Sequence, residues 1–292
     1  MGKNGENPRM ERKMEQSRFD TPAPRVGLFI TCLADIFRPS IGFSTVKLLR
    51  AAGCRVEVPR GQTCCGQPAY NGGDNRNARA LARQVVSRFE GYDYVVLPSG
   101  SCAGMLKRHY PVLFAEDPVW ASRMQRFAER CFEVTGFLVD VCGVGADIGA
   151  KAGIGLGDGD MEMIDPSSDY GVVTYHDSCS GLRELGIHAQ PRRLLERRGI
   201  EVREMAHLTK CCGFGGAFCM EYPALSVHMV SNKIAKLEKT GADTLLGGDL
   251  GCLLNIAGQL KRKGSPIRVY HVVEALAGIA GLSAIAQGTE DR

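Results

Sequence analysis

The sequence lacks the features that mark several large classes of protein. Its formal net charge of +4 over 292 residues is small, and no basic run is interleaved with aromatic residues, which argues against nucleic acid as a partner. It contains no Walker loop, and no G-x-G-x-x-G opens a helix after the first expected strand. A nucleotide-binding enzyme is therefore not indicated, and the composition is that of an ordinary globular protein.

Signal peptides and membrane spans are also missing from the pattern. Residues 1–24 are polar and charged, and we expect a disordered tail there. The longest weakly polar stretch, Leu276 to Gln287, is too short to cross a bilayer and predicts a terminal helix packed on the core. We therefore expect a cytoplasmic protein with no membrane span. In that reducing compartment its 12 cysteines favour clusters or catalysis over structural disulfides.

Cysteine, by contrast, is abundant and follows one pattern twice. Each copy has a single cysteine, then after 31 residues a Cys-Cys-Gly triplet, then a cysteine at the end of an apolar run. Four thiols per copy is the number that a tetrathiolate iron–sulfur or zinc site needs. Packing alone would preserve only hydrophobicity, so the repetition favours ligation. The eight predicted ligands are Cys32, Cys64, Cys65, Cys102, Cys179, Cys211, Cys212 and Cys252.

Strands and helices alternate around these cysteines in the same order in both copies. Alternation of this kind favours a parallel sheet in each half, and ligands of such sheets lie at the carboxyl ends of the strands. We therefore predict an α/β fold of two duplicated cysteine-rich repeats, related by a pseudo-twofold axis. The predicted strands are Val26–Ile30, Cys54–Val58, Tyr94–Leu97, Gly171–Tyr175, Glu201–Met205 and Thr244–Leu246, with helices near Ser44–Ala52, Arg76–Glu90, Pro191–Arg198 and Tyr222–Lys239.

The predicted domain organisation follows from the repeat. A glycine-dense run indicates a flexible joint between the halves. The predicted segments are a tail at 1–24, a first repeat at 25–142, a glycine-rich linker at 143–168, a second repeat at 169–278 and a C-terminal tail at 279–292.

Four cysteines lie outside the two sets. Cys54 is expected in the core face of a strand, and Cys131 on a helix that Asp117-Pro118 would start. A free cysteine behaves as a small hydrophobe in such places. Cys142 has no counterpart in the other half. Cys219 follows the second triplet closely enough to approach that site, although a packing role is favoured there too.

A histidine and an aspartate distinguish the second copy from the first. His176 and Asp177 lie just before Cys179, and no such pair precedes Cys32. We predict that they hydrogen-bond to the ligands of the second site or relay protons there, the alternative being a histidine that caps a strand end. Arg183 and His207 lie near the same loops; they favour a carboxylate site only weakly, because such arginines are usually solvated.

These strings resemble the proteins with duplicated cysteine-rich CCG domains, and among them the lactate utilization protein A family. The likeness covers about residues 25–278. It is carried by TCL at 31–33, CCGQP at 64–68, PSGSC at 98–102, YHDSC at 175–179 and CCGFGG at 211–216.

The resemblance implies an iron–sulfur, electron-transfer subunit of a cytoplasmic complex that oxidises L-lactate to pyruvate. It implies two clusters of the [4Fe-4S] type bound by the eight cysteines. The implied partners are a ferredoxin-like iron–sulfur subunit and a third, cluster-free subunit. It implies a subunit that is not an autonomous enzyme, and it assigns no catalytic residue.

The chain departs from one branch of these proteins at two positions. The heterodisulfide reductase pattern ends each repeat with Cys-x-x-Cys, which supplies a fifth thiolate. Here Ser99 and Asp249 stand where the first of those cysteines would be. Four thiolates per site therefore favour an ordinary cubane or a simpler metal site over the heterodisulfide route.

The residues leave two alternatives open. Zinc accepts four thiolates well, so one or both sites are also compatible with a zinc-bound scaffold subunit. A metal-free thiol–disulfide oxidoreductase would use the adjacent cysteines directly. It is less favoured, because vicinal disulfides are strained and the outlying cysteines would have no role.

Overall fold

The first half of the chain supplies four strands and most of the short helices. A computed structural model describes residues 23–145, 170–207, 209–279 and 281–287. The elements of the first half are β1 (Arg25–Leu28), α2 (Cys32–Phe37), α3 (Ser40–Ala51), β2 (Arg55–Glu57), α4 (Gln67–Asn71), α5 (Asn75–Phe89), β3 (Tyr94–Leu97), α6 (Gly100–Gly104), η1 (Met105–His109), α7 (Tyr110–Leu113), α8 (Ala121–Glu129), β4 (Cys131–Glu133), α9 (Val134–Gly136) and η2 (Phe137–Val141).

The described residues of the second half repeat this arrangement of strands and helices. They are β5 (Val173–His176), α11 (Cys179–Glu184), α12 (Ala189–Arg197), α13 (Phe218–Glu221), α14 (Pro223–Glu238), β6 (Thr244–Gly247), α15 (Leu250–Arg262), β7 (Arg268–His271) and α16 (Val272–Ala277).

The described part of each half forms one parallel sheet, which confirms the predicted α/β class. The first sheet has the order β2-β1-β3-β4 and the second the order β5-β6-β7. A single parallel bridge joins Val202 to Val173, at the place that β2 takes beside β1. The predicted strand Glu201–Met205 is therefore reduced to one bridging residue. Parallel strands end at a common edge, so the loops after β1 and β3, and after β5 and β6, lie together in each half.

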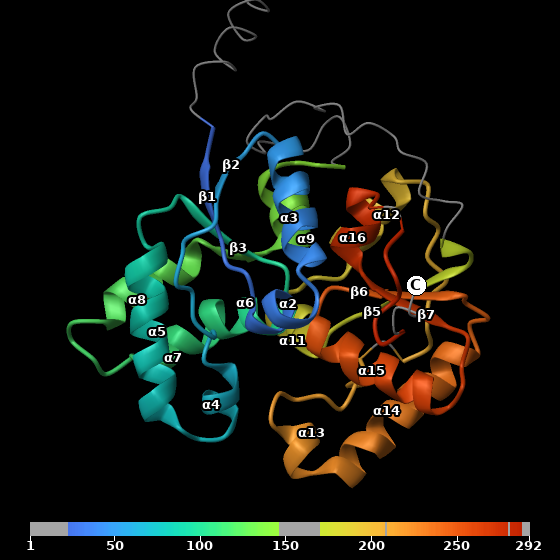
Figure 1. Cartoon of the computed structure of the whole chain (residues 1–292). Helices are drawn as coiled ribbons and strands as arrows, with labels where there is room; N and C mark the ends of the chain where they lie inside the picture. The colour runs from blue at the N-terminus through green and yellow to red at the C-terminus, as the bar shows by residue number, and fades with distance from the viewer. Residues whose placement is uncertain (1–22, 146–169, 208, 280, 288–292) are drawn as a thin grey trace, which may run out of the picture.

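A hydrogen-bonded pair of equivalent residues marks the pseudo-twofold relation between the halves. Ser99 and Asp249 each lie three residues before the last cysteine of their set, and Ser99 Oγ donates to Asp249 Oδ2 at 3.0 Å. Around this pair, α6 packs against α11, and α2 packs against α15. Figure 1 shows α2, α6 and α11 in the centre of the molecule, between the helices of the two halves.

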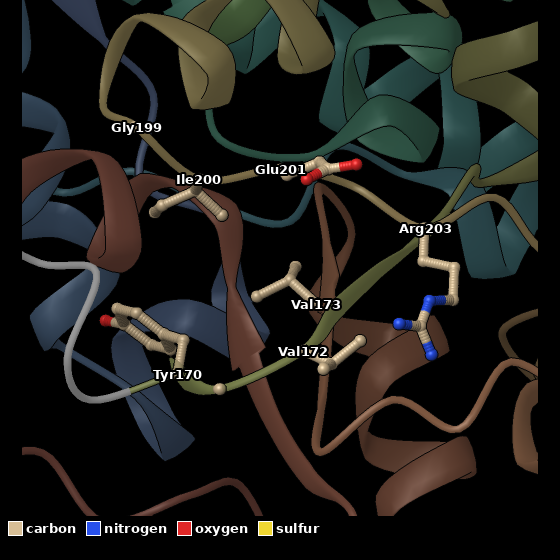
Figure 2. Close-up of a pocket in the computed structure, with 8 residues that line it drawn as sticks. Tyr170, Val172, Val173, Gly199, Ile200, Glu201 and Arg203 are labelled. Carbon is tan, nitrogen blue, oxygen red and sulfur yellow. The ribbon is translucent and has the colours of Figure 1, made fainter.

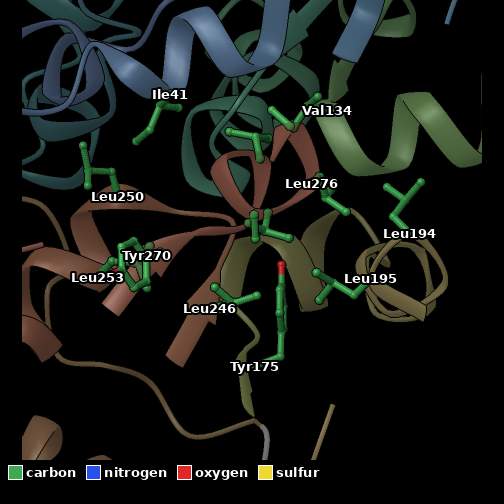
Figure 3. Close-up of a cluster of buried hydrophobic side chains, with 14 of the residues drawn as sticks. Ile41, Val134, Tyr175, Leu194, Leu195, Leu246, Leu250, Leu253, Tyr270 and Leu276 are labelled. Atoms are coloured by element: carbon green, nitrogen blue, oxygen red, sulfur yellow. The ribbon is translucent and has the colours of Figure 1, made fainter. Parts of the chain in front are cut away.

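The two halves share one hydrophobic core. Ile41 and Val134 of the first half belong to the same buried cluster as Leu246 and Leu253 of the second (Figure 3). A second cluster covers the other face of the first sheet, where Phe29 packs beneath α5, α7 and α8. Burying a leucine or isoleucine fully stabilises a fold by about 1.5–3 kcal/mol, so the shared core fixes the two sheets relative to each other.

Besides the strand predicted at Glu201–Met205, two expectations about secondary structure are wrong. Cys131 does not lie on the helix that follows Asp117; α8 ends at Glu129, and Cys131 opens the edge strand β4, where it is fully buried. The chain after Leu276 does not continue as a helix, because Gly278 takes a left-handed conformation that ends α16. Ala284 and Ile285 are nevertheless buried, and the Ile285 N–H donates to the Val269 carbonyl.

The predicted tail and linker fall largely outside the described residues. Of the tail at 1–24 only residues 23 and 24 are described, and of the linker at 143–168 only residues 143–145. Within the described segments, no helix combines the length and apolar character needed to cross a bilayer.

Candidate metal centre

The cysteines of the first set reach one site from two strand ends and one loop. Cys32 is the first residue of α2, directly after β1. Cys102 lies in the first turn of α6 after β3, and its N–H donates to Ser99 Oγ, the helix cap, at 3.3 Å. The Cys64-Cys65 pair lies in the loop before α4, where Gly66 has φ of +87° and is the helix cap. The parallel sheet therefore delivers the four thiols to its carboxyl edge.

Hydrogen bonds link the four thiols of the first site in series, from Cys32 to Cys64, Cys65 and Cys102. Cys65 Sγ and Cys102 Sγ lie 3.3 Å apart, and the Gly66 N–H donates to Cys64 Sγ at 3.4 Å. Hydrogen bonds from Cys32 and Cys65 lower the pKa of Cys64 to about 2. The hydrogen bond to Cys64, and then burial, raise the pKa of Cys32. Clustered thiols cannot all ionise without a cation among them, so this donor set suits a metal or an iron–sulfur cluster.

The second site repeats the arrangement. Cys179 opens α11 after β5, and Cys252 lies in the first turn of α15, its N–H donating to Asp249 Oδ1 at 3.5 Å. Hydrogen bonds from Cys179 and Cys212 lower the pKa of Cys211 to about 2. The bond to Cys211, and then the bond to Cys252, raise the pKa of Cys212. Both predicted sets of four are thus brought together by the fold.

His176 lies against the sulfurs of the second site. One of its ring nitrogens and the sulfurs of Cys212 and Cys252 all lie within 4.8 Å of one another. The side chain is 1% exposed, and neither ring nitrogen has a hydrogen-bond partner among the described residues. Burial lowers the pKa of His176 to about 3, which keeps the ring neutral. A neutral, unpartnered imidazole beside two thiols is suited to bind a metal or to donate a hydrogen bond to a cluster.

The other polar residues expected near this site have different surroundings. Asp177 is buried, and both of its oxygens accept hydrogen bonds from Arg192 at 2.9 Å. Arg183 donates to the Thr209 carbonyl at 2.7 Å and is exposed. His207 has a positive φ of 59° and is exposed. None of these contacts forms a carboxylate-binding site among the described residues.

The four remaining cysteines do not join either set. Cys131 is buried in the second hydrophobic cluster, and Cys219 lies in α13 with its thiol against the Gly216 carbonyl at 3.5 Å. Cys54 and Cys142 are both buried, with sulfurs 4.0 Å apart. The sequence did not indicate this last pair, because the two residues come from separate elements with no shared pattern.

A cavity of about 310 Å³ lies elsewhere, at the opposite edge of the second sheet. Figure 2 shows its lining, which includes Tyr170, Val172, Ile200 and Arg203. These residues flank the amino end of β5, whereas His176 and Cys179 lie at its carboxyl end. The cavity is therefore separate from the thiol sites.

Comparison with known proteins identifies the repeated unit. The family model described as a cysteine-rich domain matches the chain twice, over residues 26–107 and 173–257. Each match contains one complete set of four cysteines.

Several curated proteins are similar over nearly their whole length. The lactate utilization protein A of Geobacillus kaustophilus is 45% identical over 253 residues, which are 86% of this chain and 98% of that protein. The protein of the same name from Bacillus licheniformis is 43% identical over the same shares. The one from Exiguobacterium sp. is 44% identical over 256 residues, or 87% of this chain and 97% of that protein.

Proposed function

The chain belongs to the lactate utilization protein A family, and from this premise we propose that it is the iron–sulfur electron-transfer subunit of a complex that oxidises L-lactate to pyruvate. The proposed complex is cytoplasmic, in keeping with 12 cysteines free of disulfides in the described structure. The proposed partners are a ferredoxin-like iron–sulfur subunit and a third subunit without clusters.

The observation that carries this proposal is the pair of four-thiol arrays at the carboxyl edges of the two sheets. In each array the first of the two adjacent cysteines shares a thiol hydrogen bond with the cysteine that opens the set, and the second shares one with the cysteine that closes it. Soft thiolates in groups of four are the ligands that iron–sulfur clusters select. Cys32, Cys64, Cys65 and Cys102 would hold one cluster, and Cys179, Cys211, Cys212 and Cys252 the other.

The bound clusters would supply one-electron redox chemistry, and the protein's own residues fix their surroundings. Ser99 and Asp249 hold the amides of Cys102 and Cys252 at the ends of their helices. Because these two residues also bond to each other, one buried bridge connects a ligand of each site. The two sites are thereby held as neighbours at the joint between the halves, which suits transfer of electrons from one to the other.

The test is metal analysis of the full chain purified without oxygen. We expect about eight irons and eight sulfides per chain, as two cubanes require. Cys65→Ala and Cys212→Ala should each remove about half of the iron. Cys131→Ala is the matched control, because Cys131 is buried outside both sets and its loss should leave the iron unchanged.

Zinc at the second site is a second candidate, favoured by His176. Nitrogen and sulfur together are common zinc ligands. The possible ligand atoms of His176, Cys212 and Cys252 lie within 4.8 Å of one another. One stoichiometric zinc, lost in Cys212→Ala but not in Cys65→Ala, would support it. Colourless protein with two zincs would contradict the electron-transfer role altogether.

A further inference from the structure

The duplication allows the walls of the two sites to be compared position by position. An added Cβ on Gly66 would lie nearest Ala78 and Leu81, and one on Gly213 nearest Ser226 and Met229. Because Gly66 and Gly213 are equivalent, Ala78 corresponds to Ser226 and Leu81 to Met229, which fixes the alignment of α5 with α14. The buried residues of α5 then correspond one to one with those of α14: Ala78, Ala82, Val85, Val86 and Phe89 match Ser226, Val230, Lys233, Ile234 and Leu237.

The strand ends differ in this comparison. His176 and Phe29 are equivalent, since each lies three residues before the first cysteine of its set. Phe29 belongs to the buried apolar cluster that contains Cys65 and Cys102, and its ring packs on Phe89 at 5.4 Å. At the second site the same place is taken by an imidazole with no partner among the described residues.

The helices differ in the same direction. The register places Lys233 where the first half has Val85. Lys233 is 1% exposed, and its Nζ donates to the Lys210 carbonyl at 2.8 Å. Burial lowers the pKa of Lys233, whereas the nearby Cys212, Asp177, Cys252 and Cys211 raise it. Lys210 directly precedes Cys211, so the hydrogen bond to its carbonyl places the buried amine beside the loop of the second site.

Two further polar groups lie at the second site, and one of them extends the contrast. Asn255 lies three residues after Cys252 and donates to the Cys212 carbonyl at 2.9 Å. The equivalent residue after Cys102 is the buried Met105, but the equivalent Cys65 carbonyl accepts a hydrogen bond from the Tyr110 hydroxyl at 2.8 Å, so this contact is matched at the first site. Ser226 donates to the Gly213 carbonyl at 2.8 Å, at the place of Ala78. The surroundings of the first site are therefore apolar at three positions where those of the second site are polar, namely at Phe29, Val85 and Ala78 against His176, Lys233 and Ser226.

We infer that the two sites are not equivalent and that the second is the more easily reduced. Reduction adds negative charge, which a buried ammonium and N–H donors stabilise and an apolar wall does not. One electron would then leave the first site and be taken up by the second, with no other reactant. This inference rests on the proposed function, because it compares the reduction potentials of two iron–sulfur sites.

The test uses chains that keep a single site. Cys212→Ala retains the first site and Cys65→Ala the second, and anaerobic potentiometric titration followed by electron paramagnetic resonance gives the potential of each. We expect the second site to have the higher potential. Lys233→Met in the Cys65→Ala chain should lower its reduction equilibrium constant about tenfold, which is about 59 mV for one electron. Lys239→Met is the matched control, since Lys239 lies exposed at the end of the same helix.

The outcomes separate this inference from the proposed function. Equal potentials, a higher potential at the first site, or no shift in Lys233→Met overturn the inference while leaving the clusters in place. If Lys233→Met does not fold, His176→Phe serves instead, because phenylalanine is the residue at the matching place in the first half. In the His176→Phe variant the reduction potential of the second site should fall towards that of the first site, and an unchanged potential overturns the inference. Absence of iron from the parent chain overturns both proposals.

Discussion

At the first site the sulfurs of Cys65 and Cys102 lie in a cluster with Phe29, whereas at the second those of Cys212 and Cys252 lie beside His176. The backbone that carries the two sets is nevertheless the same. Each set uses one cysteine at a helix start, a Cys-Cys-Gly loop and one cysteine in a capped first turn. The duplication has therefore kept the ligand-bearing backbone and changed the side chains around it.

This contrast separates the residues that build a site from those that tune it. The helix caps Ser99 and Asp249 and the glycines Gly66 and Gly213 recur at equivalent places because each fixes backbone geometry next to a ligand. The surrounding residues differ: His176 lies beside the sulfurs, and Lys233, Asn255 and Ser226 donate to carbonyls in and next to the Cys-Cys-Gly loop. Changes to the first group should reduce stability, and changes to the second should alter redox properties.

The largest effect that we expect on stability separates the two Cys-Cys-Gly glycines. Both have positive φ, so alanine costs about 1–2 kcal/mol at either position. An added Cβ at Gly213 would also lie 2.8 Å from the Ser226 carbonyl oxygen, whereas at Gly66 the nearest atom is 3.6 Å away. Gly213→Ala should therefore cost about 1–3 kcal/mol more than Gly66→Ala in anaerobic urea unfolding.

The matched control for these glycines is Gly91→Ala. An added Cβ there meets nothing within 4 Å, and the change should stay within about 0.5 kcal/mol of the parent. Equal losses for Gly213→Ala and Gly66→Ala would show that the loop of the second site relaxes freely. The comparison of the two backbones would then have to be revised.

A smaller effect is expected at the bridge between the halves. Asp249 is buried, and it accepts hydrogen bonds from Ser99 Oγ, from the Ser101 N–H at 2.8 Å and from the Cys252 N–H. Asp249→Ala leaves these donors without a partner and should cost about 1–3 kcal/mol of unfolding free energy. Ser99→Ala removes one of these donors together with the oxygen that caps the Cys102 N–H, and should cost about 1 kcal/mol.

The double variant decides whether this bridge connects the halves. If Ser99 and Asp249 act through each other, Ser99→Ala should cost less in the Asp249→Ala chain than in the parent, with a coupling of about 0.5–3 kcal/mol. Strict additivity would mean that each residue only caps its own helix.

The ligand sets could be predicted from the sequence because their signal lies in spacing along the chain. The parallel sheets followed from the alternation of strands and helices. Strand β4 was missed because it is three residues long and follows a helix without a turn residue that would separate them. Lys233 gave no sign by itself, since a lysine within a helical pattern is normally solvated. Only the structural register of α14 on α5 shows that it takes the place of a buried valine.

The bridge could not be predicted, for a different reason. Ser99 and Asp249 are 150 residues apart, and their contact depends on how the two halves dock. Sequence marked them only as places where a further cysteine was lacking. Their role as paired helix caps appears only when the docked halves bring the starts of α6 and α15 together.

The smallest expected effect concerns pH and again contrasts the halves. Glu133 and His271 end the last strand of each sheet and cap the next helix, so they occupy equivalent positions. Glu133 Oε1 is buried and makes no hydrogen bond within the described residues, and the His271 ring is buried with the Pro98 backbone beside it. Burial raises the pKa of Glu133 to about 7 and lowers the pKa of His271. One cap therefore favours its protonated form and the other its deprotonated form, because both are held neutral.

Opposite pH dependences follow from these directions. The stability that neutral Glu133 provides is complete below its unfolded pKa of about 4.5 and is lost as pH rises towards 7. The stability that neutral His271 provides is present above about 6.5 and is lost as pH falls. Between pH 5 and 8 the free energy of unfolding of Glu133→Gln should therefore fall by about 1–2 kcal/mol less than that of the parent, as measured by anaerobic urea unfolding. As the pH falls below about 6.5, the free energy of unfolding of His271→Gln should decrease less than that of the parent. Curves of Glu133→Gln and the parent that stay parallel across this range would mean that water reaches the cap of the first half, and that the two caps do not differ in the way their burial indicates.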